Sequence, residues 1–579
     1  MPGSPSSRID ALTGALTAID EFVAARLARL HSPGVAIGLT DREQTLGFVC
    51  QGVADLASSA VVTPDTRFQI GSISKSFAAA VLLQEHDAGR VDLHAPVTEY
   101  VPWFEVRSRF APITLHHLLS HTSGLVMGTE LSGDGRHAVW MLRDTETGYP
   151  PGERFFYSND GYKLVGLTLE ALCGRPAHDL IAERIVEPLG MRETETVIRR
   201  DSPLPVATGY QRECDDRPPH AGRPLIEAPR IESCTVDGSI LSSAAEMLAY
   251  ARLILNRGIV AAVDADDGAG DWRLLSDDAY RLWTSKVIED HDEPGSFYGY
   301  GLVTRTLDGF ECVGHSGGMV GFNTLLVCEP TTGIGVVVLL NGLDDRMEMA
   351  RYALQAVRAA GAGAPVPPPP PPADPTLLGA EAAAEYAGAF EGETGGVDTL
   401  EFVARDGRLV LVPTAGPAGP ASQTGVEQPL TDGIALERRG DDTFLAPHPA
   451  WDAFHLRFER DEAGEVVALS FGPTWYLRAG RAAPPAPEPD PSWRALVGGY
   501  RSHNPWMPTL RVIERRGRLY LVAPWQYPSD ELELVLLDGG RYRVGSLKWC
   551  PDRVSFDTVI DGRATRAVFN GQPFFRTFT

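Results

Sequence analysis

The chain contains 579 residues, of which 43% are hydrophobic and 22% are charged, and its formal net charge is −24 at pH 7. This length and composition indicate a globular protein of several domains, and the acidic balance disfavours nucleic acid and anionic membranes as partners. The sequence shows no run of about 18 apolar residues, no secretory signal at its start and no C-x-x-C spacing among its seven cysteines. We therefore expect a cytoplasmic protein that uses neither a metal nor a cofactor.

The first 364 residues predict a domain that mixes helices and strands. Apolar residues recur at three- and four-residue steps from Ile9 to Leu30, which indicates one face of a helix. Further along the chain the patterns predict a β-hairpin over 34–39 and 45–50, a helix over 72–85, a buried strand over 336–340 and a closing helix over 347–357. A chain that begins with helix and hairpin and ends with strand and helix favours an α+β fold, in which one antiparallel sheet is flanked by helices.

An S-x-x-K motif, Ser72-Ile73-Ser74-Lys75, opens the predicted helix over 72–85. A spacing of three places Ser72 and Lys75 on one helical face, and the helix N-terminus supplies N–H donors beside Ser72. A serine hydroxyl is a weak nucleophile near neutral pH, and a lysine withdrawn from water can accept its proton. The motif alone also fits a surface lysine on an amphipathic helix, although the chain has only four lysines.

A Y-x-N pattern, Tyr157-Ser158-Asn159, follows between a proline turn and an apolar helical segment. A tyrosine at this place could carry the serine proton to the leaving group. The asparagine amide could hold a substrate carbonyl. An ordinary aromatic loop before a helix explains the pattern equally well when it is taken alone.

A glycine-rich H-x-G segment, residues 314–318, lies between two strand-like runs. Gly317 and Gly318 would let a substrate backbone approach the edge of a strand. His315 could donate a hydrogen bond to the substrate or to Tyr157. A simple turn histidine is the alternative, and it is the better one for this motif in isolation.

The order of these three motifs resembles the class C β-lactamase and penicillin-binding-protein superfamily of serine hydrolases. Segment 118–125, Leu-Leu-Ser-His-Thr-Ser-Gly-Leu, and segment 298–302, Tyr-Gly-Tyr-Gly-Leu, are similar to that superfamily too. The resemblance covers most of residues 10–360 and implies a β-lactamase/transpeptidase-like fold for the first domain.

The resemblance also implies a role for each motif residue. Ser72 would form an acyl-enzyme, with Lys75 and Tyr157 as general base and general acid. The backbone N–H groups of Ser72 and Gly318 would form the oxyanion hole, where such donors are typically worth ~3 kcal/mol each. The substrate-binding residues would be Asn159, His315, Gly317 and Gly318.

The third motif departs from the penicillin-recognising members, which carry Lys-Thr-Gly where this chain has His315-Ser316-Gly317. In those members the lysine is the usual partner of a substrate carboxylate. The H-x-G form is similar to D-aminopeptidases, which implies hydrolysis of a peptide, amide or ester with a free amino end. An esterase, or a thioesterase-like acyltransferase that transfers or cyclises peptides, fits the same motifs. A β-lactamase and a non-catalytic binding protein fit them less well.

The C-terminal part is predicted to hold two small antiparallel β-barrels, of which the first is lipocalin-like. Proline-rich linkers at 365–375 and 481–492 would separate the first domain, 1–364, from the barrels, 376–480 and 493–579. The barrels resemble each other: Phe390 and Arg478 of the first recur as Tyr500 and Arg576 of the second, and an insertion at 414–425 accounts for the difference in length.

The same three-domain architecture is implied by the resemblance to D-aminopeptidases. It implies that a loop of the last barrel borders the active site, for which 502–508 and 524–528 are the candidates. The predicted partners are a small-molecule or peptide substrate and a second copy of the chain in a homodimer, without nucleic acid or membrane.

Overall fold

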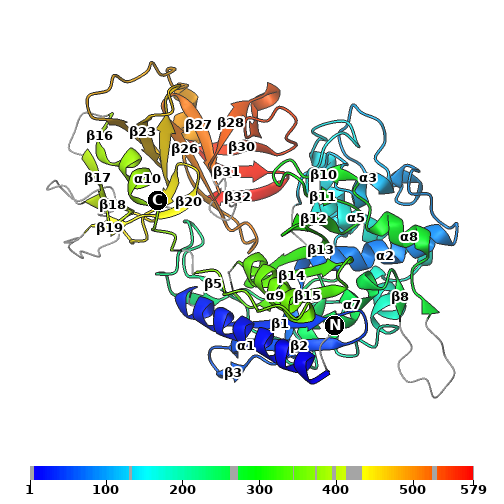
Figure 1. Ribbon diagram of the computed structural model, residues 1–579. Coiled ribbons are helices and arrows are strands. Elements are labelled where there is room, and N and C mark those ends of the chain that lie inside the picture. The colour runs from blue at the N-terminus through cyan, green and yellow to red at the C-terminus, as the bar shows by residue number, and fades with distance from the viewer. Residues whose placement is uncertain are drawn as a thin grey trace. The chain divides into compact units, whose positions relative to one another are not determined.

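The computed structural model describes residues 5–30, 32–128, 134–260, 272–342, 345–371, 374–393, 399–412, 433–523 and 531–577. The chain divides into two compact units (Figure 1). Unit 1 comprises Met1–Gln211 and Ile226–Pro371, and unit 2 comprises Arg212–Leu225 and Pro372–Thr579. The assignment of 212–225 to unit 2 was not foreseen from the sequence, and the exact domain boundaries given above stay predictions.

Unit 1 is built around a nine-stranded antiparallel sheet, which confirms the predicted α+β architecture. β1 lies between β2 and β15, so the first strand of the chain pairs with the last strand of the unit, with Val35 opposite Leu340. The strands, in their order across the sheet, are β10 (Ile288–Glu289), β11 (Phe297–Tyr298), β12 (Val303–Leu307), β13 (Phe310–Met319), β14 (Phe322–Glu329), β15 (Ile334–Leu340), β1 (Gly34–Thr40), β2 (Thr45–Asp55) and β3 (Ala60–Val61).

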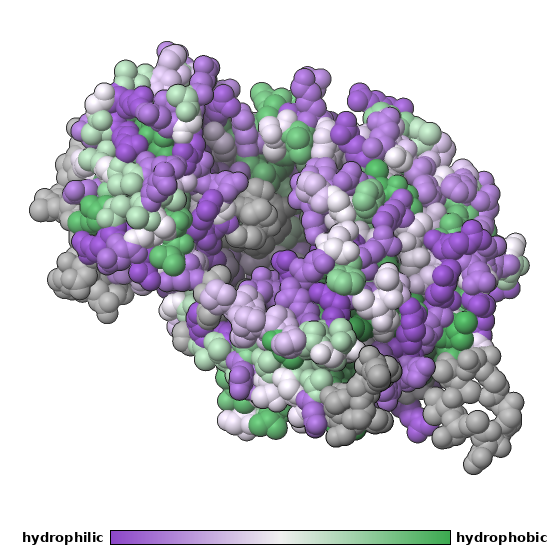
Figure 2. Space-filling view, in the orientation of Figure 1, coloured by the Kyte–Doolittle hydropathy of each residue, from purple (hydrophilic) through white to green (hydrophobic). Residues whose placement is uncertain are grey.

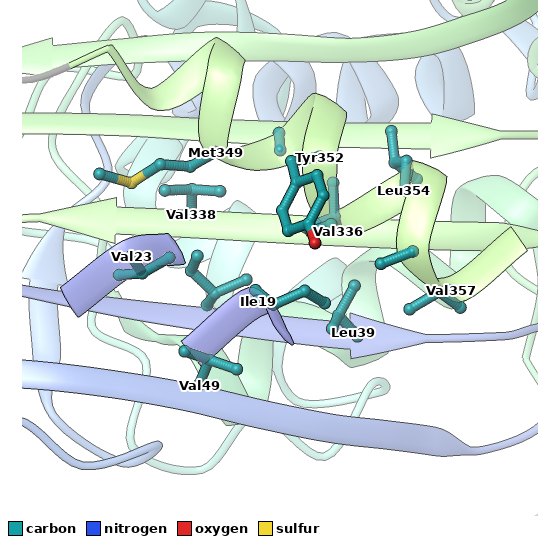
Figure 3. Packing of buried hydrophobic residues seen from close by; sticks show 14 of the residues in the cluster. Ile19, Val23, Leu39, Val49, Val336, Val338, Met349, Tyr352, Leu354 and Val357 are labelled. Atoms are coloured by element: carbon teal, nitrogen blue, oxygen red, sulfur yellow. The ribbon is translucent and has the colours of Figure 1, made fainter. Parts of the chain in front are cut away.

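Helices cover both faces of this sheet. On one face α1 (Pro5–Leu30) and α9 (Arg346–Gly361) pack together, and Ile19 and Tyr352 meet Leu39 and Val338 in one apolar cluster (Figure 3). On the other face α7 (Ala244–Leu255) approaches so closely that a Cβ added to Gly38 would lie 3.1 Å from Leu248. Burial on both faces explains why β1 and β15 read as continuous apolar runs.

The helix predicted over 72–85 is α2, but it begins at Ser74 and ends at Asp87 (Ser74–Asp87). Ser72 lies instead in the 3-10 turn Gly71–Ile73 that precedes it. α2 is buried along most of its length and contacts α5 (Asn159–Cys173) and α8 (Asp277–Trp283). Its Ala- and Leu-rich sequence therefore reflects a position inside the unit. The remaining helices of this region are α3 (Leu115–Leu119), α4 (Arg136–Met141) and α6 (Ala177–Ile181).

Residues on the face drawn in Figure 2 are mostly hydrophilic, and the hydrophobic ones form separate small patches. Among the described residues, none of the helices is both long enough and apolar enough to cross a bilayer. The cytoplasmic location stays a prediction.

Unit 2 contains two antiparallel β-structures, as predicted. In the first, the order across the sheet is β19 (Ile434–Ala435), β18 (Arg408–Val412), β17 (Thr399–Arg405), β16 (Gly388–Gly392), β24 (Thr474–Arg478), β23 (Val466–Phe471), β22 (Leu456–Arg460), β21 (Thr443–Leu445) and β20 (Glu437–Gly440), preceded by α10 (Ala380–Tyr386). The second is a closed barrel of β25 (Gly498–Arg501), β26 (Thr509–Arg515), β27 (Arg518–Val522), β28 (Glu531–Leu536), β29 (Arg541–Val544), β30 (Arg553–Ile560), β31 (Arg563–Phe569) and β32 (Gln572–Arg576).

The internal repeat is visible in the strand register. Phe390 of β16 lies opposite Arg478 of β24, and Tyr500 of β25 lies opposite Arg576 of β32. In both copies the guanidinium lies over the aromatic ring, 5.8 Å from the centroid in the first and 5.0 Å in the second. Because both the strand pairing and the cation–π contact recur, the two β-structures are an internal repeat, as the sequence predicts. The predicted insertion at 414–425 lies outside the described residues.

Of the two candidate loops of the last barrel, 524–528 lies outside the described residues. Loop 502–508 folds onto its own barrel. Met507 is buried in the barrel core, Trp506 packs against that core, and Asn504 donates a hydrogen bond of 3.1 Å to Gln572. Trp506 therefore contributes to the packing of the barrel, whatever else the loop contacts.

Segment Arg212–Leu225 is tied to the rest of unit 2 by a buried carboxylate. The Asp452 side chain is 0% exposed and accepts hydrogen bonds from Arg217 (3.2 Å), His220 (3.0 Å) and Arg223 (2.7 Å). Burial opposes ionisation of Asp452, but the hydrogen bonds from His220 and Arg223 hold its pKa below the usual value of 3.8. The Asp452 carboxylate thus acts as the anchor of segment 212–225: its hydrogen bonds hold this segment against the rest of unit 2.

We expect Asp452→Asn to destabilise unit 2 by about 3–5 kcal/mol, because it leaves the largely buried Arg217 and Arg223 without their counter-charge. Urea unfolding of the full chain measures the loss, and Asp441→Asn, whose side chain is fully exposed, is the control. The lowered pKa means that this stabilisation is complete above the unfolded-state pKa and is lost as the pH falls below 3.8. Equal unfolding midpoints for the two variants would contradict the assignment of Asp452 as an anchor.

Candidate active site

Lys75 is the centre of the candidate site. It is 0% exposed, and its Nζ lies 3.0 Å from Ser72 Oγ, 2.7 Å from Asn159 Oδ1 and 2.8 Å from the backbone oxygen of Asp237. The structure thus brings the first two motifs together, as the sequence predicts. The contact with Asp237 was not predicted.

The partners of Lys75 orient its proton-accepting face. The Asn159 amide oxygen and the Asp237 carbonyl can only accept hydrogen bonds, whereas the Ser72 hydroxyl can also donate one. When Lys75 is in its amine form, its two N–H bonds are directed to the two carbonyl oxygens and its lone pair faces the Ser72 hydroxyl. This is the geometry that transfer of the serine proton to lysine requires.

The second motif is held at the start of α5. The Ser158 side chain caps that helix by accepting from the N–H of Gly161, and the Asn159 N–H bonds to the carbonyl of Met127. The Tyr157 ring is partly exposed, and its centroid lies 5.0 Å from Lys75 Nζ. Because Asn159 Oδ1 accepts from Lys75, its Nδ2 group is the part of the side chain that can donate to a substrate carbonyl.

Close backbone packing positions the candidate oxyanion hole. Gly71 has φ +56°, and a Cβ on it would lie 2.7 Å from the nitrogen of Gly318. A Cβ on Gly317 would overlap the carbonyl oxygen of Ile70 and the hydroxyl of Thr324, which itself bonds to Ile70 O at 2.8 Å. By contrast, Gly318 is exposed and its Cβ position is open. The turn carrying Ser72 therefore lies directly against β13, beside an accessible strand edge.

His315 lies within β13 and not in a turn between strands, and its ring nitrogens have other partners than those predicted. Nδ1 lies 2.5 Å from the carbonyl oxygen of Ser316, and Nε2 lies 2.9 Å from the Tyr298 hydroxyl. Burial, followed by the charge of Lys75, lowers the pKa of His315 to about 3. The imidazole is therefore neutral: it donates from Nδ1 to the carbonyl and accepts from Tyr298, and it has no N–H left for Tyr157.

His121 is a second buried imidazole of the site, which the sequence reasoning used only as part of the resemblance. Its Nδ1 accepts from the N–H of Ser158 at 3.0 Å, and its ring lies 4.1 Å from the Tyr157 ring, centroid to centroid. Burial, with the charge of Lys75, lowers the pKa of His121 well below its usual value. His121 therefore packs as a neutral ring under the Y-x-N loop and fixes its conformation.

Asp237 is the site residue that sequence reasoning missed. It lies in a turn that is anchored on both sides: Val236 is in contact range of Gly166 in α5, and Gly238 lies beside Gly71 and Met319. It is only 6% exposed. Its contact with Lys75 is made by a backbone oxygen, so no residue pattern could have shown it.

Metal ligands are not gathered at this site in the described part of the chain. There, the one group of three His, Cys, Asp or Glu side chains close enough to share an ion is Asp290, His291 and Asp292. These are consecutive residues with partly or fully exposed side chains, which are common without an ion.

The sequence is similar to known proteins of one family. The model of the beta-lactamase family matches residues 19–360. Penicillin-binding protein 4 of Amycolatopsis lactamdurans is 28% identical over 323 residues, which are 54% of this chain and 81% of that protein. A D-aminopeptidase of Cereibacter sphaeroides is 29% identical over 349 residues, which are 58% of this chain and 60% of that enzyme.

Among solved structures, the octameric penicillin-binding protein homologue from Pyrococcus abyssi superposes with a TM-score of 0.55 at 24% identity. The match covers 79% of this chain and 99% of that one. It supports the fold of this chain.

Proposed function

Because this chain belongs to the beta-lactamase family, we propose that it is a serine hydrolase in which Ser72 forms an acyl-enzyme. The observation that carries the proposal is the position of Lys75, buried and directed at Ser72 Oγ by two carbonyl acceptors. Ser72 attacks the substrate carbonyl while its proton passes to Lys75. The N–H groups of Ser72 and Gly318 stabilise the negative charge that develops on the carbonyl oxygen.

The second half of the reaction uses the same groups. Lys75 or Tyr157 returns a proton to the leaving group, and the acyl-enzyme is then hydrolysed by water that these groups activate. Asn159 Nδ2 holds the substrate's amide carbonyl, and Gly317 lets the substrate lie along the edge of β13. His315 shapes this edge through its bonds to Ser316 and Tyr298.

We propose D-aminopeptidase-like substrates: peptides, amides or esters with a free amino end. The H-x-G form of the third motif supports this, as does the relative from Cereibacter sphaeroides. A neutral, buried His315 supplies no positive charge for a substrate carboxylate. An ammonium-bearing substrate also suits the net charge of −24.

We expect the enzyme to turn over nitrocefin poorly and to prefer neutral or cationic acyl donors. The measurement is a substrate panel of nitrocefin, p-nitroanilides of D- and L-amino acids, and p-nitrophenyl esters. The esters report an esterase, which shares the acyl-enzyme step. Nitrocefin hydrolysis with a kcat of about 10 s⁻¹ or more, a rate typical of enzymes, would contradict the proposed substrate class.

A further inference from the structure

The carboxylate of Asp237 stands out among the charged groups of unit 1. The residue is 6% exposed, and within the described residues nothing donates a hydrogen bond to its buried Oδ1. A buried carboxylate oxygen without a donor is costly, and native structures rarely leave one without a reason. A ligand that donates to it would remove this cost.

The backbone of Asp237 lies close to the reacting atoms. Lys75 Nζ bonds both to the Asp237 backbone oxygen (2.8 Å) and to Ser72 Oγ (3.0 Å), so these two oxygens are at most about 6 Å apart. The neighbouring residue, Gly238, lies against Gly71, which precedes Ser72 in the chain. The backbone of Asp237 therefore lies beside the place where a substrate carbonyl would meet the nucleophile.

The chemistry of an aminoacyl substrate matches this placement. Standard bond lengths put its α-amino nitrogen ~2.5 Å from the carbonyl carbon that Ser72 attacks. That nitrogen is protonated near neutral pH and offers three donors, whereas a carboxylate can only accept. Lys75 Nζ already bonds to Ser72, Asn159 and a backbone oxygen, so the Asp237 carboxylate is left for another cation.

We propose that the Asp237 carboxylate binds the protonated α-amino group of the substrate and thereby selects substrates with a free amino end. This inference rests on the proposed function. It adds the residue that binds the amino group of the substrate. Asp237 would place the scissile carbonyl between Ser72 and the N–H of Gly318, because the bound ammonium fixes one end of the acyl group. No covalent step involves Asp237.

The test compares the binding of a free amine with that of a blocked amine. Binding is measured as inhibition of the hydrolysis of a neutral ester substrate. Hydrolysis of p-nitrophenyl acetate is measured with D-alanine amide or N-acetyl-D-alanine amide as competitor. In the unmodified enzyme, the free amine should inhibit at least tenfold more strongly than its acetylated form. In Asp237→Asn, which keeps the shape of the side chain, this preference should disappear. Glu232→Gln removes one exposed negative charge from the chain segment that precedes Asp237. This control variant should keep the preference for the free amine.

The outcomes separate the two proposals. If Asp237→Asn weakens both competitors and ester hydrolysis by one common factor, the carboxylate acts through Lys75 and the proposed binding role is wrong. If the unmodified enzyme hydrolyses the ester through Ser72 but shows no preference for the free amine, the role of Asp237 fails while the serine hydrolase stands. If neither ester hydrolysis nor acylation of Ser72 is seen, both fail. A circular dichroism spectrum and unfolding midpoint equal to those of the unmodified enzyme identify a folded variant; Asp237→Ser is the substitute if Asp237→Asn does not fold.

Discussion

Ser72→Ala is expected to lower kcat on the best substrate of the panel by at least ~10⁴-fold, because the acyl-enzyme cannot form without the hydroxyl. Lys75→Ala should be nearly as damaging, since the lysine takes the proton that the serine must lose. The double variant should be no worse than the more impaired single variant, because groups that act as one unit do not lose activity additively. Steady-state kinetics on the three proteins give these values.

The chain offers a control for the loss of a lysine. Lys286 is about half exposed and pairs with Glu311 on the surface, so Lys286→Ala should leave kcat within twofold of the original. A Ser72→Ala protein that keeps more than a tenth of the original kcat would exclude Ser72 as the nucleophile.

Gly317→Ala is expected to have the second large effect, a loss of ~10²–10³-fold in kcat together with a lower unfolding midpoint. The added methyl would overlap Ile70 O and Thr324 Oγ1, so β13 must move away from the turn that carries Ser72. Overpacking of this kind typically costs 1–3 kcal/mol of stability. Displacement of the Gly318 N–H from the oxyanion removes a donor whose loss lowers kcat by this order.

Gly318→Ala is the matched control for stability. Nothing lies within 4 Å of a Cβ placed there, so this variant should keep the unfolding midpoint of the original protein. Gly317→Ala could instead unfold at the midpoint of the original protein and keep the original kcat. In that case β13 tolerates the added methyl, and close packing against residue 70 is not needed for activity.

Much of the site could be predicted because its residues carry their chemistry in short motifs. The S-x-x-K spacing places Ser72 and Lys75 one helical turn apart, and the Lys75–Asn159 contact follows once the family resemblance brings the Y-x-N motif to the same place. The apolar runs at 34–39 and 336–340 likewise predict two buried strands. Their pairing as neighbours, with Val35 opposite Leu340, depends on contacts between the two ends of the unit, which no local pattern encodes.

The features that escaped prediction are those set by backbone atoms or by burial. Asp237 contacts Lys75 through a carbonyl oxygen that every residue type possesses. The hydrogen bonds of His315 depend on Tyr298 on the strand β11, not on the Tyr157 that the motif suggested. Segment 212–225 is held to the C-terminal residues by one buried carboxylate, Asp452, through its bonds to Arg217, His220 and Arg223, which lie far from it in sequence.

The central claim, that Ser72 is the nucleophile activated by Lys75, is tested most directly by acylating-probe labelling. The protein is treated with a fluorophosphonate, its intact mass is measured, and the modified residue is located by peptide mapping. We predict one adduct per chain on Ser72, none in Ser72→Ala, and labelling at least ~10²-fold slower in Lys75→Ala. An adduct on another residue, or equal labelling of the unmodified protein and Ser72→Ala, would contradict the claim.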